Sequence, residues 1–305
     1  MIITKSIDCN KIQVILKGIK KYRQNFKNWA AVYFHIVKRR YPITVKTRDG
    51  TTQTIYGLNE LFLIMSGFKD YSYDAKLKKI SLNYQGKQVE FYGSEENGDL
   101  PSTFVGEDYR DLSVKDEVVI DIGANIGDTA VYFILNSAKS VIAVEPFELS
   151  FQSLIMNLKL NNMDKRVRAI QAGISSKDSI IKIPIGYLSS TLNKLNPTTA
   201  KDLHIEKSVE IPIFSLKGLL DFVGSVDPVL KMDCEGCEYD VILNSDTNTI
   251  RKVKRWVVEY HYDYLPLISK FQDAGFKTKV VVSEPFYNRA KKKVMTTGIL
   301  YAFRQ

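Results

Sequence analysis

Two styles of hydrophobic patterning divide the chain. From residue 115 onward, short apolar runs alternate with segments whose apolar residues recur at helical spacing. This alternation predicts a largely parallel sheet with helices on both faces, an α/β fold over residues 111–305. The predicted strands are 118–122, 140–145, 167–174, 228–233 and 255–261, and the predicted helices are 127–137, 148–161, 238–244 and 265–274.

Two stretches depart from this alternation. Residues 176–215 contain two extra strand-like pieces and a polar loop around Pro197. Residues 279–304 contain two apolar runs, which predict two strands joined by a loop.

The first 110 residues predict a small α+β region. Apolar residues recur at helical spacing over 10–40, and the pattern ends at Tyr41-Pro42 because the residue before proline avoids helical backbone angles. Two hairpins follow, around Asp49-Gly50 and Gln85-Gly86, since these pairs supply left-handed turn residues. Between the hairpins we predict a short helix over 59–68, closed by Gly67.

Basic charge is concentrated near the N-terminus. Eleven of the 43 basic residues lie between Asp8 and Asp49, where no acidic residue occurs, and the other 32 are slightly outnumbered by 34 acidic residues. The plainest interpretation of this segment is a solvated face packed on the domain. A second is peripheral contact with an anionic membrane through residues 10–40, where the aromatic side chains would enter the interface. These are Tyr22, Phe26, Trp29 and Tyr33.

Nucleic acid is a less favoured partner. The basic charge is local, and a domain that binds RNA along a whole face should itself be basic. An RNA substrate held by the basic segment stays an alternative.

The lack of a recognisable targeting signal and the small number of cysteines predict a cytoplasmic protein. It would lie at the membrane periphery if the basic segment binds lipid. The sequence has no apolar run of about 18 residues and no signal-like N-terminus. Its three cysteines cannot form a disulfide framework. Because no second pair exists to complete a zinc site, we expect Cys234 and Cys237 to be small apolar packing residues.

The segment VVIDIGANIGDTAVYF (residues 118–133) is the strongest local signal for a cofactor site. Asp121 ends a predicted buried strand, and Gly123 and Gly127 flank the turn into a helix. Asn125 stands where a dinucleotide fingerprint requires its middle glycine, which disfavours NAD. Asp121 can bind an ammonium group, which S-adenosylmethionine has and NAD lacks.

The next strand ends in a second acidic residue. Glu145 follows Asp121 by 24 residues, and a carboxylate at this place accepts hydrogen bonds from ribose hydroxyls. Pro146 and Phe147 follow it and offer an apolar wall for an adenine ring. The alternative is a buried aspartate satisfied by turn amides, together with a helix-capping acid.

A second motif, VLKMDCEGCEYD, spans residues 229–240. Within residues 231–238 it brings Lys231 together with three carboxylates, Asp233, Glu235 and Glu238, and Lys231 and Asp233 point to the same side of a strand. We predict that Lys231 is an ion-pair partner of Asp233 rather than a Schiff-base lysine. A hard cation held by Asp233, Glu235 and Glu238 is the alternative, and our prediction is that no metal is bound.

The order DIGANIGDTA, then AVEP, then KMDCEGCEYDVIL resembles the FkbM family of S-adenosylmethionine-dependent methyltransferases. VEYH, residues 258–261, is similar to the E-x-H of that family. The resemblance covers residues 104–284 and leaves out the first hundred residues. It implies a Rossmann-like seven-stranded methyltransferase sheet and O-methylation, commonly of sugar or polyketide hydroxyls.

The family motifs also imply roles for single residues. Asp121, Gly123, Gly127 and Glu145 match the cofactor residues, and Asp233 and Glu235 match the position that faces the transferred methyl.

For the general base that transfer to a hydroxyl requires, His261, Asp233 and Glu235 are the candidates. The prediction is an O-methyltransferase acting on a glycan or small-molecule acceptor. An RNA methyltransferase anchored by the basic N-terminal segment and a non-catalytic cofactor-binding module are the alternatives.

Overall fold

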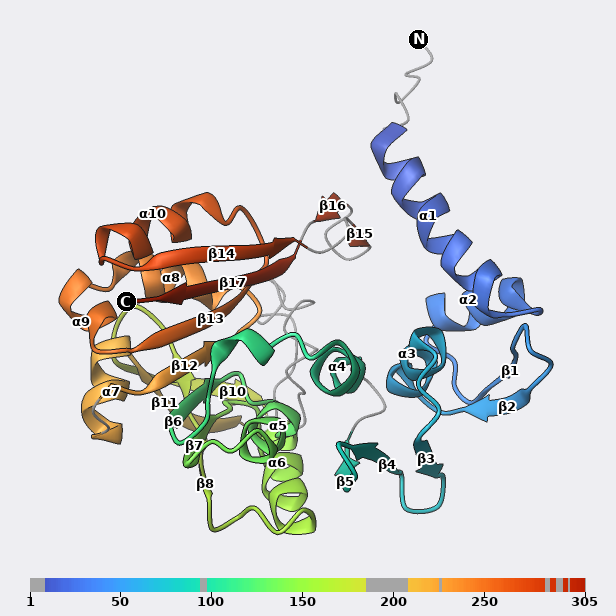
Figure 1. Cartoon of the computed structure of the whole chain (residues 1–305), viewed down its shortest axis with the longest axis horizontal. Coiled ribbons are helices and arrows are strands. Elements are labelled where there is room, and N and C mark those ends of the chain that lie inside the picture. Colours follow the sequence, from blue (N-terminus) through green and yellow to red (C-terminus); the bar gives the residue numbers. More distant parts are fainter. Residues whose placement is uncertain are drawn as a thin grey trace.

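A seven-stranded sheet forms the centre of the protein, which is described here from a computed structural model over residues 9–93, 98–184, 208–224, 227–282, 286–288, 293–295 and 297–304. The strand order is β14-β17-β13-β12-β6-β7-β8 (Figure 1). Strands β13 to β8 in this order are parallel, and β17 is antiparallel to both neighbours. The predicted α/β class is confirmed. The strands are β6 (Val118–Ile122), β7 (Ser140–Val144), β8 (Val167–Ile170), β12 (Val229–Met232), β13 (Arg255–Tyr260), β14 (Lys277–Val282) and β17 (Gly298–Phe303).

Helices cover both faces of this sheet. Alternate side chains point to opposite faces, so Val119, Val229 and Val257 belong to one apolar cluster and Ile120 and Leu230 to the other. The first face is covered by α5 (Asp128–Leu135) and α6 (Glu148–Leu160). The second is covered by α7 (Leu216–Val223), α8 (Cys237–Asn244), α9 (Thr247–Arg251) and α10 (Leu265–Asp273).

The N-terminal part consists of helices and two small sheets, as predicted, with β3 and the short helices after residue 98 as additions. The first helix after the β1–β2 hairpin ends at Ser66, and Gly67 caps it in the left-handed conformation. The elements are α1 (Cys9–Asn25), α2 (Trp29–Val37), β1 (Ile43–Lys46), β2 (Thr52–Ile55), α3 (Leu58–Ser66), β3 (Tyr71–Asp74), β4 (Lys79–Tyr84), β5 (Lys87–Tyr92), α4 (Asp99–Pro101), η1 (Ser102–Gly106) and η2 (Arg110–Leu112).

The predicted helical region 10–40 is two helices, because the residues between them pair with the β1 hairpin. Phe26 forms a bridge to Thr47, and the Asn28 side chain bonds the backbone of Thr44 and Lys46. Phe26 is fully buried, and Tyr22 and Trp29 pack on the same cluster. Phe26 therefore belongs to the protein core, whereas Tyr22 and Trp29 are only partly buried, and the interpretation that residues 10–40 contact a membrane stays a prediction.

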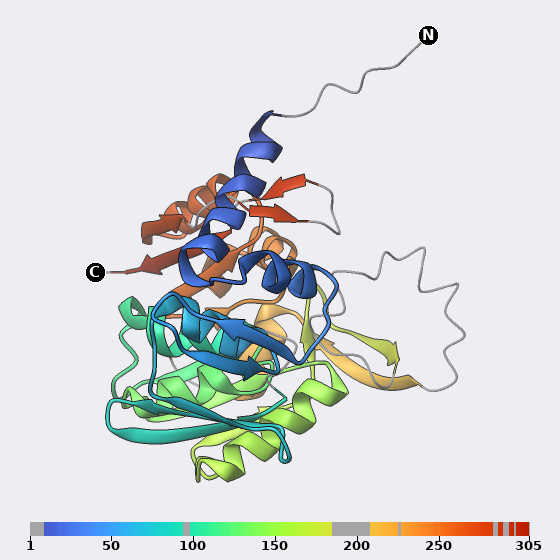
Figure 2. The same cartoon turned by 90° about the vertical axis from the view of Figure 1, so that its right-hand side faces the viewer.

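Three other elements differ from the sequence analysis. The predicted strand 167–174 is two strands in different sheets, since β9 (Gly173–Ile174) pairs with β11 (Ser208–Phe214). The extra strand-like pieces are β11 and β10 (Ser179–Pro184), which pair with each other, and Pro197 lies outside the described residues. Helices α7 and α9 were not predicted. The C-terminal loop carries a short hairpin, β15 (Phe286–Asn288) and β16 (Lys293–Met295), which lies beside α1 (Figure 2).

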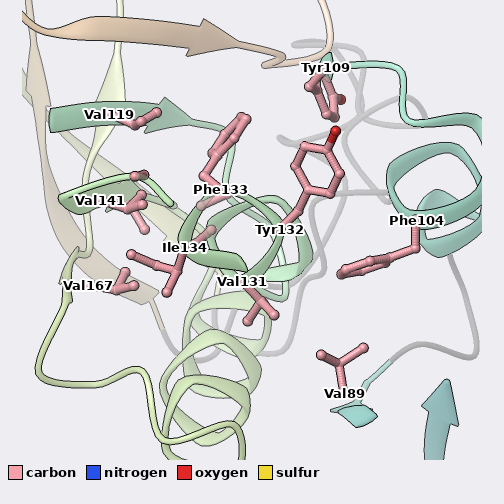
Figure 3. Packing of buried hydrophobic residues seen from close by; sticks show 14 of the residues in the cluster. Val89, Phe104, Tyr109, Val119, Val131, Tyr132, Phe133, Ile134, Val141 and Val167 are labelled. Atoms are coloured by element: carbon pink, nitrogen blue, oxygen red, sulfur yellow. The ribbon is translucent and has the colours of Figure 1, made fainter. Parts of the chain in front are cut away.

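One apolar core joins the N-terminal part to the sheet. Val89 and Phe104 belong to the same cluster as Val119 and Val131 (Figure 3). Figure 3 also shows Tyr132 between the sheet and Phe104. The ring centroids of Tyr132 and Phe104 lie 6.0 Å apart. The segment 98–112 is thus packed over the sheet face on which Asp121 lies.

Among the described helices, none combines the length and the apolar character needed to cross a membrane.

Candidate functional site

Asp121 and Lys231 form a buried charged pair on two neighbouring parallel strands. They stand opposite each other in the register of β6 and β12, and Lys231 Nζ lies 3.2 Å from Asp121 Oδ1. The other oxygen of Asp121 accepts a hydrogen bond from the Thr129 hydroxyl. Asp121 is fully buried. The positive charge that faces this carboxylate therefore belongs to the protein.

Lys231 also fixes the turn after β6. Its ammonium donates to the carbonyl of Gly123 at 2.9 Å, and it lies 4.0 Å from Asp233 Oδ2. Burial alone would lower the pKa of Lys231, but Asp121, then Asp233, outweigh it, so the pKa stands above its usual value. The sequence analysis named Asp233 as the ion-pair partner. The shorter contact is to Asp121, because strand register places these two residues side by side.

Gly123 is required by the protein's own packing. It has φ +76°, and a Cβ at this position would lie 1.7 Å from the Asp233 carbonyl oxygen. The turns after β6 and β12 therefore touch, which couples the two motifs.

Glu145 is held between the two turns that follow β6 and β7. Its Oε2 accepts the N–H of Asn125 at 3.0 Å, and its Oε1 accepts the N–H of Phe147 at 3.0 Å. Burial raises the pKa of Glu145 to about 7, against the effect of these two amides. The carboxylate is thereby fixed at the carboxyl end of β7, and each oxygen keeps a second lone pair.

Phe147, which was predicted with Pro146 to form an apolar wall for an adenine ring, packs against other residues instead. Its side chain is buried among Ile183, Ile211 and Ile213 from the β10–β11 sheet. Pro146 is half-buried beside it. Gly127 has φ +89°, and a Cβ there would meet Leu154 of α6.

Two further carboxylates reach this region that the sequence analysis did not name. Asp99, from α4, accepts a hydrogen bond from the Asn125 side chain. The residue is exposed at the surface, and desolvation by the surrounding chain, followed by the charge of Asp128, raises its pKa to about 7. Asp128 accepts from the Thr103 hydroxyl, and burial raises its pKa to about 6. Asp128 follows Gly127 directly and was visible as a charged residue at a helix start. Asp99 carried no signal, since only tertiary packing brings it to Asn125.

His261 lies among three carboxylates at the end of β13. Its Nε2 is 3.6 Å from Glu235 and 3.9 Å from Asp233, and its Nδ1 is 3.4 Å from Glu238. Burial would lower the pKa of His261, but Glu238 and the charges of Asp233 and Glu235 raise it to about 10. Glu259, two residues earlier, has its pKa raised well above the usual value, by burial and then by Asp233.

Cys234 and Cys237 are joined by a disulfide, so the prediction that both are merely packing residues is wrong. Glu235 and Gly236 have φ +59° and +120°, and this turn brings the two Cα atoms to 5.5 Å. Such a separation lies in the range that a disulfide spans. Both side chains also pack on the second apolar cluster. Because two of the three cysteines are paired, their small number no longer indicates a reducing compartment.

The family comparison matches this region of the chain. Residues 121–278, more than half of the chain, match the methyltransferase FkbM domain. The chain belongs to the FkbM methyltransferase family. The resemblance seen in the sequence is confirmed, and every predicted site residue lies inside the matched range, whereas Asp99 lies outside it.

Relatives of this FkbM protein include methyltransferases. Methyltransferase sdnD of Sordaria araneosa is 29% identical over 171 residues, which are 46% of this chain and 65% of sdnD. The chain thus matches less than two thirds of the length of that relative.

Similar solved structures include precorrin-6y C5,15-methyltransferase of Geobacter metallireducens, with 15% identity, coverage of 67% of this chain and 87% of that one, and a TM-score of 0.38. Another is Sp1610 of Streptococcus pneumoniae, a putative tRNA (m1A22) methyltransferase in complex with S-adenosylmethionine. Its identity is 15%, its coverage 67% of this chain and 74% of that one, and its TM-score 0.38.

Proposed function

We propose that the protein transfers a methyl group from S-adenosylmethionine to a hydroxyl oxygen of a glycan or another small molecule. The observation that carries this proposal is Glu145, a buried carboxylate fixed by two backbone amides at the carboxyl end of β7. Open parallel sheets bind ligands beyond this edge, and an acid at this place accepts ribose hydroxyls. Family membership supports the same cofactor.

Residues around the β6 turn would hold the rest of the cofactor. Asn125, whose N–H already contacts Glu145, and half-buried Pro146 border the ribose and adenine positions. Asp121 is the proposed partner of the cofactor's ammonium group. Because its Oδ1 faces Lys231, this contact would place two cations on one carboxylate, and the nearby acids Asp99 and Asp128 offset the added charge.

Chemistry would take place at the ends of β12 and β13. In an in-line displacement, the acceptor oxygen attacks the methyl carbon, the bond from that carbon to the sulfonium breaks, and S-adenosylhomocysteine leaves. The hydroxyl proton passes to a side chain. Glu235 is our proposed base, since its side chain is 41% exposed and lies 3.6 Å from His261. Lys231 is assigned a structural role.

Calorimetry with S-adenosylmethionine, S-adenosylhomocysteine and NAD tests the cofactor assignment. We expect saturable binding of the first two and none of NAD. Binding of NAD alone would refute the proposal. Labelled methyl donor supplied with glycan, small-molecule and RNA fractions then identifies the acceptor class, and transfer to RNA alone would refute the hydroxyl-bearing small molecule.

The Glu235→Gln variant tests the base. It should lose turnover while its affinity for S-adenosylmethionine stays unchanged, because Glu235 is not among the residues proposed to hold the cofactor. Asp240→Asn, on helix α8 just after Glu235 and bonded to Ser175, is the control and should keep its turnover. Unchanged turnover in Glu235→Gln would leave Asp233 or His261 as the base.

Peripheral membrane contact is a separate proposal for α1 and α2. Figure 1 shows α1 projecting from the rest of the protein. Leu16 and Phe34 are 58% and 51% exposed. Helix α1 also carries five basic residues, Lys11, Lys17, Lys20, Lys21 and Arg23. We expect sedimentation with vesicles that contain phosphatidylserine and not with phosphatidylcholine vesicles. Loss of this difference at high salt, and in Leu16→Ser, would support the contact. Equal binding to both vesicle types would refute it.

A further inference from the structure

Three ligand-type side chains converge at the ends of β12 and β13. Asp233 follows β12, Glu238 lies in the first turn of α8, and His261 follows β13. One oxygen or ring nitrogen from each of them lies within 4.8 Å of the other two. Because three separate segments supply these atoms, the fold and not a single loop creates the cluster.

Buried polar atoms at this cluster lack hydrogen bonds. Glu238 is fully buried, and its Oε1 accepts the N–H of Cys234. Its Oε2 has no hydrogen-bond partner among the described residues, and Nδ1 of His261, which is 8% exposed, meets only Glu238 Oε1, at 3.4 Å and without a well-formed hydrogen bond. A buried carboxylate oxygen without a partner is costly, so a native protein normally supplies a partner for it.

The charges at the cluster are unbalanced. His261 faces the carboxylates of Asp233, Glu235 and Glu238 at 3.4–3.9 Å. Lys231 is 4.0 Å from Asp233 but closer to Asp121, and it is therefore shared with the cofactor turn. Asp233 and Glu238 thus face one imidazole, whose single proton balances only one of these two carboxylates.

We propose that Asp233, Glu238 and His261 bind a divalent transition-metal ion. Carboxylate oxygen and imidazole nitrogen together suit Zn²⁺ or Mn²⁺, whereas Ca²⁺ takes oxygen ligands alone. Ligand atoms at about 2.1 Å from a tetrahedral ion lie about 3.4 Å apart. His261 can offer one ring nitrogen: its Nδ1 lies 3.4 Å from Glu238 and its Nε2 lies 3.9 Å from Asp233. The three ligand atoms lie within 4.8 Å of one another, so they must close toward the ion when it binds. The ion replaces the ring proton when it binds.

The site differs from the one that the sequence alternative described. That alternative used Asp233, Glu235 and Glu238, and here His261 takes the place of Glu235. Three protein ligands leave one position open, as in catalytic metal sites. This open position would hold the acceptor oxygen and lower the pKa of its hydroxyl, a role that rests on the proposed function.

The test is calorimetric titration of the full chain, freed of metal by chelation, with Zn²⁺ and separately with Mn²⁺, in the absence of S-adenosylmethionine. We expect one ion per chain for at least one of the two. Glu238→Gln should weaken binding by about 100-fold, since it removes a charged ligand of the buried set. Asp240→Asn, on the same helix but bonded to Ser175 and Ser176, should bind as the wild type does.

Two results would overturn the metal site. One is no saturable binding of either ion, and the other is equal affinity in the wild type and in Glu238→Gln, which indicates surface binding only. If Glu238→Gln does not fold, His261→Gln replaces it, and the visible absorption of bound Co²⁺ reports whether a nitrogen ligand is lost. Binding of S-adenosylmethionine is measured on the same samples, so failure of the metal site is distinguished from failure of the methyltransferase proposal.

Discussion

At the scale of single residues, the protein centres on one buried cation between carboxylates. Lys231 is 1% exposed and touches Asp121, the carbonyl of Gly123 and, at longer range, Asp233. Charged groups are buried at a high cost unless they are paired. Removing either member of the Asp121–Lys231 pair would leave the other charge buried without a partner, so the pair has a large influence on the free energy of unfolding.

Lys231→Met should destabilise the protein by about 3–5 kcal/mol, because it leaves Asp121 buried without a counter-charge. Asp121→Asn, which keeps an oxygen for the Thr129 hydroxyl, should be similarly harmful. The double variant should lose less than the sum of the two, since neither charge then remains unpaired. Urea unfolding measures all three free energies, and strict additivity would show that the pair is not coupled.

Glu145 should make cofactor affinity depend on pH. Its pKa is raised to about 7, so the ionised form that accepts two ribose hydroxyls is populated only as the pH rises through that value. Affinity for S-adenosylmethionine should rise between about pH 6 and 8, and folding stability should fall over about pH 4.5 to 7, since the folded protein holds this proton more tightly. Calorimetry and urea unfolding across this range measure both.

Glu145→Gln is the control for that titration. It should bind S-adenosylmethionine about 10-fold more weakly at high pH, from the loss of charged hydrogen bonds, and should no longer respond to pH. Asp99 titrates in the same range, with its pKa at about 7. A pH dependence that persists in Glu145→Gln and disappears in Asp99→Asn would move the effect to Asp99.

At the scale of elements, the two motifs form one structural unit because their turns touch. Gly123, between β6 and α5, has no space for a side chain against the Asp233 carbonyl. The turn after β12 in turn carries the Cys234–Cys237 disulfide. A change in either turn is therefore transmitted to the other through backbone contact.

Gly123→Ala and Gly67→Ala separate this contact from backbone strain. Both glycines have nearly equal φ, +76° and +78°, but a Cβ at Gly67 would meet nothing within 4 Å. Gly67→Ala should cost about 1–2 kcal/mol, the usual cost of a left-handed alanine. Gly123→Ala should cost several kcal/mol more, on the order of a severe core substitution, since backbone must move. Equal losses in urea unfolding would show that the turns do not press on each other.

At the scale of the whole molecule, the N-terminal part is fixed to the sheet by polar as well as apolar contacts. The Asn157 side chain, on α6, bonds both backbone groups of Tyr92 in β5 and the carbonyl of Ile126. Asn161 does the same one turn later with Glu90. The boundary near residue 110 is a change in sequence pattern across which the apolar core continues.

Asn157→Leu should destabilise the chain by about 3 kcal/mol, because three buried backbone groups lose their partner. Its N-terminal part should also become more sensitive to a protease. Gln152→Leu, on the same helix and bonded only to exposed Glu148, should change stability by no more than about 0.5 kcal/mol. Calorimetric unfolding and timed proteolysis measure these effects. Wild-type resistance in Asn157→Leu would show that the docking depends on apolar contacts alone.

The sequence by itself determined most of the strands and helices and the two motifs, because strand and helix periodicity and glycine-containing turns are local properties. Asp121 and Glu145 were recognisable for the same reason, as acids at the ends of apolar runs. Only the tertiary structure decided that Lys231 faces Asp121, that Asp99 reaches Asn125, and that Glu238 and His261 meet. These contacts depend on strand register and on the packing of segments far apart along the chain, and no local pattern encodes such distances.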